Sequence, residues 1–236
     1  MKIYETYPGG KGSNGTYQTI INLIPPCRTL IIPFLGNCAI LRNIKLPPEV
    51  IAIDKDTAVI EKWKSNCNSS GIIFINGDGT QYLKNIPDHI DNSGTVVYCD
   101  PPYLIDSRKS KRNIYKFELD ENSHQDLLST IKALRSRVLI SSLENNLYLN
   151  ELSKWNHITF MNKIRTGMQK EFVFYNFNNS MHQLQDYRYL GQNFREREII
   201  KRKLNRWNNK FKNLSAYEKN AMIELLSSSI IDIKSV

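Results

Sequence analysis

Short apolar runs alternate with segments of helical periodicity along the chain up to about residue 180. The runs are rich in Val, Ile and Phe and are followed by Gly, Pro or acidic residues, as buried β-strands often are. They predict strands at residues 29–36, 50–54, 72–75, 96–99, 137–141, 157–161 and 171–177. The intervening segments predict helices at residues 16–24, 56–66, 123–134 and 146–153. This alternation predicts an α/β fold.

The last two predicted strands are connected differently from the others. The turn between them lies at residues 162–167, which are too few for a crossover helix, so we expect these strands to pair antiparallel. The earlier strands are separated by longer segments, as in βαβ units. We therefore predict a mostly parallel sheet with one antiparallel strand.

Three successive strands end on or near an acidic residue: Asp54, Asp78 and Asp100. A single such residue is usually a helix cap or a turn former. Three in succession favour a common site, because the carboxyl ends of parallel strands meet at one edge of the sheet. A carboxylate there commonly binds ribose hydroxyls. Since no Gly-x-Gly-x-x-Gly motif is present, we expect a nucleoside cofactor without a pyrophosphate.

The run at residues 96–99 continues into Asp100-Pro101-Pro102-Tyr103. Proline cannot donate to a strand ladder and fixes its own φ, so this stretch predicts a rigid loop at the end of a strand. A carboxylate, proline-locked carbonyl groups and an aromatic face together suit a planar ligand with an amino group, such as a nucleobase. The alternative is a strand followed by an ordinary Pro-Pro turn.

Two polar stretches leave more than one interpretation open. Lys11 lies in a glycine-rich loop at residues 7–15, but the spacing of a phosphate-binding P-loop is absent, so on the residues alone we expect a solvated turn. Residues 104–116 have no periodicity and predict a mobile basic loop over the site, which either contacts a polyanion or is simply solvated. Its basic side chains are Arg108, Lys109, Lys111 and Arg112.

Positive charge is concentrated late in the chain. The 236 residues carry a formal net charge of +9, and nine Arg or Lys against two Glu place +7 of it at residues 187–214. Apolar residues recur there at helical spacing, which predicts an amphipathic helix at residues 194–214 with a basic outer face. A capping box at residues 215–218 predicts a second helix. The basic face is expected either to contact nucleic acid or to be a solvated surface.

Several classes of protein are disfavoured by what the sequence lacks. No apolar run approaches the length of a membrane span, and the first residues do not form a signal peptide, so we expect the protein to stay in the cytosol. The four Cys show no Cys-x-x-Cys pairing and the four His are scattered, so neither a disulfide framework nor a metal site is expected.

Together these stretches resemble a known family, the phage and bacterial DNA adenine methyltransferases that use S-adenosylmethionine. The resemblance is strongest in the Asp-Pro-Pro-Tyr motif combined with the Gly-Gly-Lys opening at residues 9–11. It implies a Rossmann-like class I methyltransferase sheet in a domain at residues 1–180, with a basic C-terminal helical extension at residues 181–236 packed on it. Further matching segments are residues 33–36, 53–56, 76–78, 139–141, 189–191, 194–198, 202–203 and 206–207.

The resemblance also implies a site that uses S-adenosyl-L-methionine and no metal. Asp54 would hold the cofactor's ribose and Asp78 its adenine. The residues implied to bind the cofactor are Tyr7, Lys11, Phe34, Gly36, Asp54 and Asp78. The residues implied to receive the target adenine are Asp100, Pro101, Pro102 and Tyr103. Family members with a dedicated target-recognition domain often carry it between the positions of Asp78 and Asp100, and too few residues separate these positions here. DNA reading is therefore assigned to the loop at residues 104–116, the turn at residues 162–170 or the basic tail. The residues expected to contact DNA are Arg108, Lys109, Lys111, Arg112, Lys201, Arg202 and Arg206.

Two positions depart from the family pattern. Ile32 and Cys38 stand where the family usually has an acid and a second glycine. They leave open a catalytically weak or inactive paralogue that acts as a DNA-binding subunit. A methyltransferase for another amine or amide acceptor, in RNA or protein, is the other alternative. The expected partner is duplex DNA with a flipped-out adenine, and neither the recognition sequence nor the oligomeric state follows from the sequence.

Overall fold

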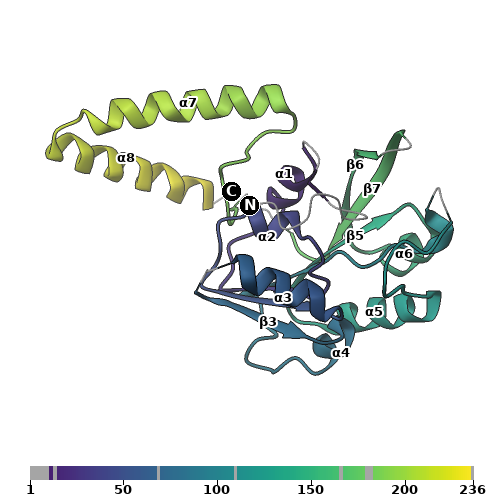
Figure 1. Cartoon of the computed structure of the whole chain (residues 1–236). Helices are drawn as coiled ribbons and strands as arrows, with labels where there is room; N and C mark the ends of the chain where they lie inside the picture. Colours follow the sequence, from purple (N-terminus) through teal and green to yellow (C-terminus); the bar gives the residue numbers. More distant parts are fainter. Residues whose placement is uncertain are drawn as a thin grey trace. The chain divides into compact units, whose positions relative to one another are not determined.

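The structure is a computed structural model that describes residues 11–12, 15–67, 70–108, 111–164, 167–178 and 183–234. Within these residues seven strands form one sheet in the order β3-β2-β1-β4-β5-β7-β6 (Figure 1). The strands are β1 (Thr29–Ile32), β2 (Glu49–Asp54), β3 (Ile72–Asn76), β4 (Thr95–Cys99), β5 (Arg137–Leu143), β6 (Asn156–Ile164) and β7 (Gly167–Tyr175).

The pairing of the strands confirms the predicted fold class. β1 pairs parallel with β2 and β4, and the pairs β2–β3 and β4–β5 are also parallel. β7 runs antiparallel to both of its neighbours, β5 and β6. The sheet is therefore mostly parallel with one antiparallel strand, as expected for a Rossmann-like class I methyltransferase.

Six helices of the same region connect or flank the strands. They are α1 (Thr16–Ile21), α2 (Ala39–Asn43), α3 (Thr57–Asn66), α4 (Gly79–Lys84), α5 (Glu121–Ala133) and α6 (Asn146–Glu151), and a 3₁₀ turn, η1, spans Ile105–Ser107. The four predicted helices are confirmed, with ends that differ by a few residues. α2 and α4 were not predicted, because helices this short show little periodicity.

The central strands of the sheet are buried on both faces. Alternate residues of β1, β2, β4, β5 and β7 form one apolar cluster with α4, α5 and α6. Their neighbours in the strands, such as Leu30, Val50 and Val96, are also fully buried and point to the opposite face because side chains alternate along a strand. Burial on both faces explains why these strands appear as continuous apolar runs in the sequence.

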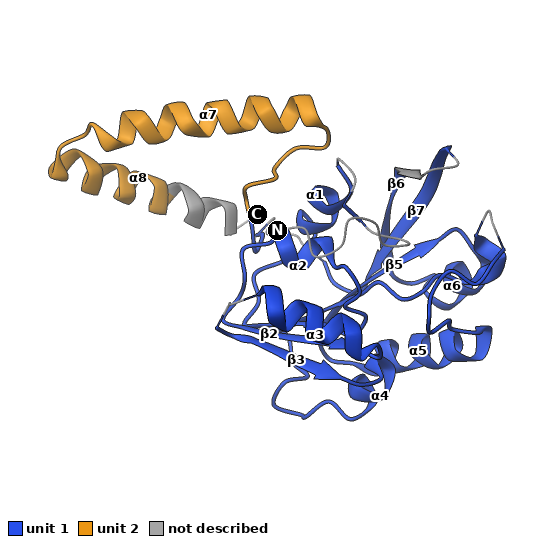
Figure 2. Cartoon of the chain, in the orientation of Figure 1, with its two compact units in different colours: residues 1–179, 183–186 blue, residues 180–182, 187–236 orange. Residues whose placement is uncertain are grey.

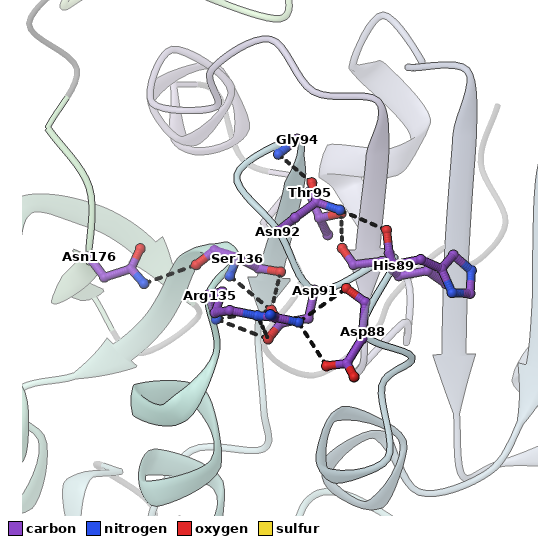
Figure 3. Close-up of polar contacts among 10 residues, drawn as sticks. Asp88, His89, Asp91, Asn92, Gly94, Thr95, Arg135, Ser136 and Asn176 are labelled. Carbon is purple, nitrogen blue, oxygen red and sulfur yellow. Dashed lines mark hydrogen bonds and ion pairs between the residues drawn. The ribbon is translucent and has the colours of Figure 1, made fainter.

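A polar network holds the amino-terminal ends of β4 and β5, at the edge of the sheet opposite the acidic strand ends (Figure 3). The buried Asp91 carboxylate accepts hydrogen bonds from the backbone N–H groups of Arg135 (3.0 Å) and Ser136 (2.9 Å) and from the Ser136 hydroxyl (2.6 Å). Asn176, just after β7, donates to the Ser136 carbonyl at 3.1 Å. These bonds fix where β4 and β5 begin, and β4 then delivers Asp100 only five residues after Thr95.

The chain divides into two compact units, which are coloured separately in Figure 2. Unit 1 holds the sheet, α1–α6 and residues 183–186, whereas unit 2 holds the described residues from 187 onward. Asp186 and Gln185 belong to unit 1, where the Asp186 carboxylate accepts from the Lys45 N–H at 2.8 Å. The predicted domain boundary and the packing of the extension on the domain stay predictions.

Unit 2 consists mainly of the two predicted helices, α7 (Phe194–Lys212) and α8 (Ala216–Lys234). Asn193 caps α7 by accepting from the Glu196 N–H at 2.9 Å. The predicted capping box begins α8, since the Glu218 carboxylate accepts from the Ser215 N–H at 2.7 Å and the Ser215 hydroxyl accepts from the Glu218 N–H at 3.3 Å. No residue of α7 is buried. Among the described residues, no helix combines the length and the hydropathy that a membrane crossing requires.

Candidate active site

A cavity in unit 1 lies at the carboxyl ends of β1, β2 and β4. This is the edge at which the acidic residues were expected to meet, and the structure brings them together there. Eight predicted site residues line the cavity: Lys11, Phe34, Gly36, Asp54, Asp78, Asp100, Pro101 and Pro102. Tyr7 lies outside the described residues.

Two backbone N–H groups, one from the turn after β1 and one from the residues after β2, donate to the carboxylate of Asp54. The Gly36 N–H donates to Oδ2 at 2.7 Å, and the Asp56 N–H donates to Oδ1 at 2.8 Å. Gly36 adopts φ +43°, in the left-handed region, and its carbonyl accepts from the Trp63 indole at 2.8 Å. Burial raises the pKa of Asp54, and the two N–H donors oppose that effect. Each carboxylate oxygen has two lone pairs, so the oriented carboxylate can still accept from ligand hydroxyls.

Asp78 has two roles at the start of α4. Its Oδ1 caps the helix by accepting from the N–H groups of Thr80 (2.9 Å) and Gln81 (3.1 Å), and its Oδ2 lies 3.4 Å from the Lys55 ammonium. The next residue, Gly79, packs so closely on the end of β1 that a Cβ atom there would lie 2.0 Å from the Pro33 carbonyl oxygen. Asp78 is thus a helix cap that also faces the cavity.

The Asp100 carboxylate belongs to a buried cluster with Lys11, Tyr103 and Glu171. The Lys11 ammonium lies 3.0 Å from Asp100 Oδ1 and 3.1 Å from Glu171 Oε2, and it also donates to the Tyr103 hydroxyl. That hydroxyl lies 3.2 Å from Asp100 Oδ1 and 3.3 Å from Glu171 Oε2. The expectation that Lys11 is in a solvated turn is wrong, because the side chain is only 2% exposed and its charge is paired.

Charge pairing sets the titration of this cluster. Burial lowers the pKa of Lys11, but the carboxylates of Asp100 and Glu171 outweigh it and hold that pKa above its ordinary value. Burial raises the pKa of Asp100, and the Lys11 ammonium opposes the effect. Lys11 is therefore an ammonium ion at neutral pH.

The loop after Asp100 is closed by Arg108, which is 5% exposed. Its guanidinium donates to the Tyr103 carbonyl and forms an ion pair with Glu118 at 2.5 Å. Glu118 also accepts from the N–H groups of Ile114 (2.7 Å) and Tyr115 (3.0 Å). Burial raises the pKa of Glu118, but Arg108 and these donors outweigh it and lower the pKa to about 2.

This arrangement differs from the predicted mobile basic loop. The guanidinium of Arg108 is buried and paired with Glu118, so in this structure it holds the loop and is not exposed to a polyanion. Lys111 and Arg112 are exposed, as a role in polyanion binding requires. Lys109 lies outside the described residues.

The segment held by Glu118 forms part of the cavity wall, which was not predicted. Tyr115 and Phe117 line the cavity with aromatic rings. Lys116 lies 2.9 Å from the Asp56 carboxylate, and thus connects this segment to the amino terminus of α3. The sequence alone offered only a Tyr-x-Phe pair in a polar stretch, a signal too weak to assign to a site.

Residues 80–166 match the family model of the D12 class N6 adenine-specific DNA methyltransferases. The match covers less than half of the chain and includes the Asp-Pro-Pro-Tyr loop. It confirms the resemblance to adenine-specific DNA methyltransferases that the motifs indicated. No curated protein matches the sequence.

Solved structures with similar folds are distant in sequence. A precorrin 8W decarboxylase from Methanobacterium thermoautotrophicum is 15% identical, with a TM-score of 0.47 over 75% of this chain and 97% of that chain. An rRNA methylase from Streptococcus thermophilus is 12% identical, with a TM-score of 0.42 over 68% and 93%. Magnesium protoporphyrin IX methyltransferase from Synechocystis, with bound SAM, is 10% identical, with a TM-score of 0.44 over 69% and 78%. The fold class itself follows from the strand order and directions.

Binding of any nucleic acid would use a cationic surface for the phosphate backbone. Lys201, Arg202 and Arg206 are exposed on α7 in unit 2. Trp207 is 56% exposed beside them, with the Lys210 ammonium 5.3 Å from its ring centroid. These side chains are accessible to a polyanion, and their contact with DNA stays a prediction.

Two contacts of Tyr103 were not predicted: the contact of its ring with the Lys11 ammonium and the contact of its hydroxyl with Glu171. Tyr103, predicted to stack on the adenine, is 6% exposed, and the Lys11 ammonium lies 4.5 Å from its ring centroid. Glu171, on β7, contacts both residues but was part of a predicted strand with no expected role. The available signal was a single acid directly before the apolar run at residues 172–174, and such an acid is usually a solvated strand end.

Proposed function

We propose that the chain is a DNA adenine methyltransferase that moves the methyl group of S-adenosylmethionine to the exocyclic amino nitrogen of adenine. The observation that carries this proposal is the position of the Asp-Pro-Pro-Tyr loop. Asp100 and the two prolines face the same cavity as Asp54 and Asp78, so an acceptor base and a nucleoside cofactor would meet there. The family match over residues 80–166 supports adenine in DNA as the acceptor.

The residues of the cavity suit S-adenosylmethionine, which would supply an electrophilic methyl group on a sulfonium centre. Asp54, oriented by two backbone donors, is suited to accept from the ribose hydroxyls. Phe34 and Phe117 offer apolar walls for the adenine ring, and the Asp78 carboxylate can accept from its amino group. Carboxylates near the cavity also favour a cationic ligand.

Asp100 and the Pro101 carbonyl would act on the acceptor amine as hydrogen-bond acceptors. The lone pair of this amine is delocalised into the ring, and a carboxylate is far too weak a base to deprotonate it in advance. Accepting its hydrogens localises the lone pair and stabilises the positive charge that develops as the methyl group is transferred. The proton leaves the nitrogen afterwards.

An adenine inside a duplex cannot reach this cavity, so the base must be flipped out, at a cost of a few kcal/mol. Tyr103 is buried and the Lys11 ammonium lies 4.5 Å from its ring centroid, so in this arrangement Lys11 and not a base covers the ring. The exposed cations of α7 would bind the phosphate backbone without reading the sequence.

The two departures from the family pattern are compatible with activity. Cys38 has φ −49°, which any residue can adopt, and its sulfur accepts from the Leu41 N–H at 3.4 Å as the N-cap of α2. Ile32 is fully buried in β1. Neither position requires glycine or a charge for the turn to form, so the turn is kept despite both departures.

The test is methyl transfer from tritiated S-adenosylmethionine to three acceptors: unmethylated duplex DNA, RNA and protein. We expect label in DNA only. Label in RNA or protein, or none in DNA, would refute the proposed acceptor. Calorimetry with S-adenosylmethionine separates the cofactor from the acceptor: Asp54→Asn should weaken binding, whereas the exposed control Asp88→Asn should not.

A further inference from the structure

Glu171 is an acid buried in an otherwise apolar part of β7. It is 3% exposed, precedes the buried residues Phe172 and Val173, and pairs in the sheet with Leu143 on β5 and Phe160 on β6. An ionised carboxylate is costly to bury unless it is paired and hydrogen-bonded. Its partners include the Lys11 ammonium at 3.1 Å and the Tyr103 hydroxyl at 3.3 Å.

These partners connect Glu171 to one particular oxygen of Asp100. Lys11 and the Tyr103 hydroxyl both contact Asp100 at Oδ1. Within the described part of the chain, Oδ2 makes no hydrogen bond, and Asp100 lines the cavity. Glu171 thus fixes the two groups that occupy one carboxylate oxygen while the other can accept from a ligand.

Glu171 also changes the charge balance beside the Asp-Pro-Pro-Tyr loop. An ammonium 3.0 Å from Asp100 would by itself disfavour a second positive charge at the same carboxylate. Glu171 adds a negative charge on the other side of Lys11. Two carboxylates and one ammonium leave the cluster with a net negative charge, which favours an amine that becomes positive as it reacts.

We propose that Glu171 is a positioning residue for methyl transfer, which holds Lys11 and Tyr103 at Oδ1 of Asp100 so that Oδ2 receives the acceptor amine. Its charge offsets that of Lys11 during the transfer. This inference rests on the proposed function and adds a residue from the antiparallel part of the sheet to the site.

Other ionisable groups around the cluster are neutral in the working pH range. Burial raises the pKa of the Tyr98 and Tyr103 phenols and of the Cys99 thiol, and it raises the pKa of Tyr115 and of Cys38 to about 12. These groups therefore add no charge to the cluster of Lys11, Asp100 and Glu171.

The experiment compares Glu171→Gln with Glu144→Gln in the full chain. Glu144 follows β5, is 57% exposed and pairs only loosely with Lys170, at 3.6 Å, so it is a matched control on the same part of the sheet. The first measurement is the pKa of the Lys11 ammonium, from an NMR titration of labelled lysine assigned with Lys11→Arg. The second is the pH dependence of kcat for methyl transfer to DNA.

Removing the carboxylate of Glu171 should lower the Lys11 pKa, because one anion beside the ammonium is lost. It should also lower the Asp100 pKa, because a like charge is lost, so both limbs of the kcat profile should move to lower pH. We expect kcat to fall by about 10- to 100-fold, the range typical of residues that orient a catalytic ligand, with KM within about twofold. Glu144→Gln should change none of these. If the glutamine variant does not fold, Glu171→Asp takes its place. This variant keeps the charge, and its pKa of Lys11 and its kcat should lie between those of the wild type and those expected for Glu171→Gln.

An unchanged Lys11 titration in Glu171→Gln would overturn the inference, as would an equal loss of kcat in Glu144→Gln. A wild-type chain that does not methylate DNA, but whose Lys11 titration shifts in Glu171→Gln, would refute the proposed function while supporting the charge pairing. The two failures are therefore distinguishable.

Discussion

Unit 1 and unit 2 use positive charge in opposite ways. In unit 1 the Lys11 ammonium is 2% exposed and is paired with Asp100 and Glu171, and the Arg108 side chain is 5% exposed and is paired with Glu118. In unit 2 all basic side chains of α7 except the half-buried Arg197 are exposed, and no residue of that helix is buried. The same residue types thus form a rigid site in one unit and an open cationic surface in the other.

The difference in environment sets what each group of charges can do. Pairs removed from solvent are screened little, so they can fix side-chain positions and shift pKa values. Exposed charges are screened by salt and contribute little to stability, but they attract a polyanion without precise geometry. We therefore expect substitutions in unit 1 to affect folding and kcat, and substitutions in unit 2 to affect DNA affinity and its salt dependence.

The largest effect on folding should come from Lys11→Met. Removing the cation takes the ammonium away from the Asp100 carboxylate and from the buried Glu171 carboxylate, and breaking a buried ion pair typically costs about 3–5 kcal/mol of unfolding free energy. The loss should shrink at acid pH, where the carboxylates can bind protons. Urea unfolding at several pH values measures it. The partly exposed pair of Lys84 with Asp126 provides the control Lys84→Met, which should cost less than about 1 kcal/mol.

Asp100→Ala should nearly abolish methyl transfer. Losing a preorganised group that stabilises developing charge typically lowers kcat by about 10²- to 10³-fold. Single-turnover kinetics with duplex DNA measure this, and Asp106→Ala is the control, since Asp106 is exposed on η1. Transfer at the wild-type rate by a folded Asp100→Ala variant would remove Asp100 from the mechanism.

Glu118→Gln should destabilise unit 1 in a pH-dependent way. The folded-state pKa of Glu118 is about 2, below its ordinary value of 4.5, so its charge stabilises the fold above pH 4.5 and this stabilisation is lost as the pH falls toward 2. We expect a loss of about 2 kcal/mol at neutral pH, typical of hydrogen bonds to a charged group. Thermal unfolding curves of variant and wild type should converge near pH 2, and a difference independent of pH would contradict the role of this pair.

The smallest effect should follow charge reversal in unit 2. Changing Lys201, Arg202 and Arg206 to Glu should weaken DNA binding by roughly tenfold, and each lost phosphate contact should reduce the slope of log K against log salt by about 0.9. Fluorescence anisotropy over a salt series measures both. Reversal of Arg28, Lys64 and Lys154, which are exposed in unit 1, is the matched control. An equal slope change in both variants would make the α7 surface an ordinary solvated face.

The sequence predicted the features that depend on residues close together in the chain. Apolar runs identified the central strands because these strands are buried on both faces, and Asp54, Asp78 and Asp100 meet at one edge because parallel strands align their carboxyl ends. The pairing of charges could not be predicted. Lys11 seemed solvated because its partners lie 89 and 160 positions away, and the position of Glu171 in the site depends on the sheet order.

Mass spectrometry of nucleosides tests the central claim most directly. Unmethylated duplex DNA is incubated with the chain and S-adenosylmethionine carrying a deuterated methyl group, and the DNA is then digested to nucleosides. The account predicts deuterated N6-methyl-2′-deoxyadenosine with the wild type and Asp106→Ala, and almost none with Asp100→Ala. Label on cytosine, or no labelled nucleoside although the chain binds S-adenosylmethionine, would contradict it.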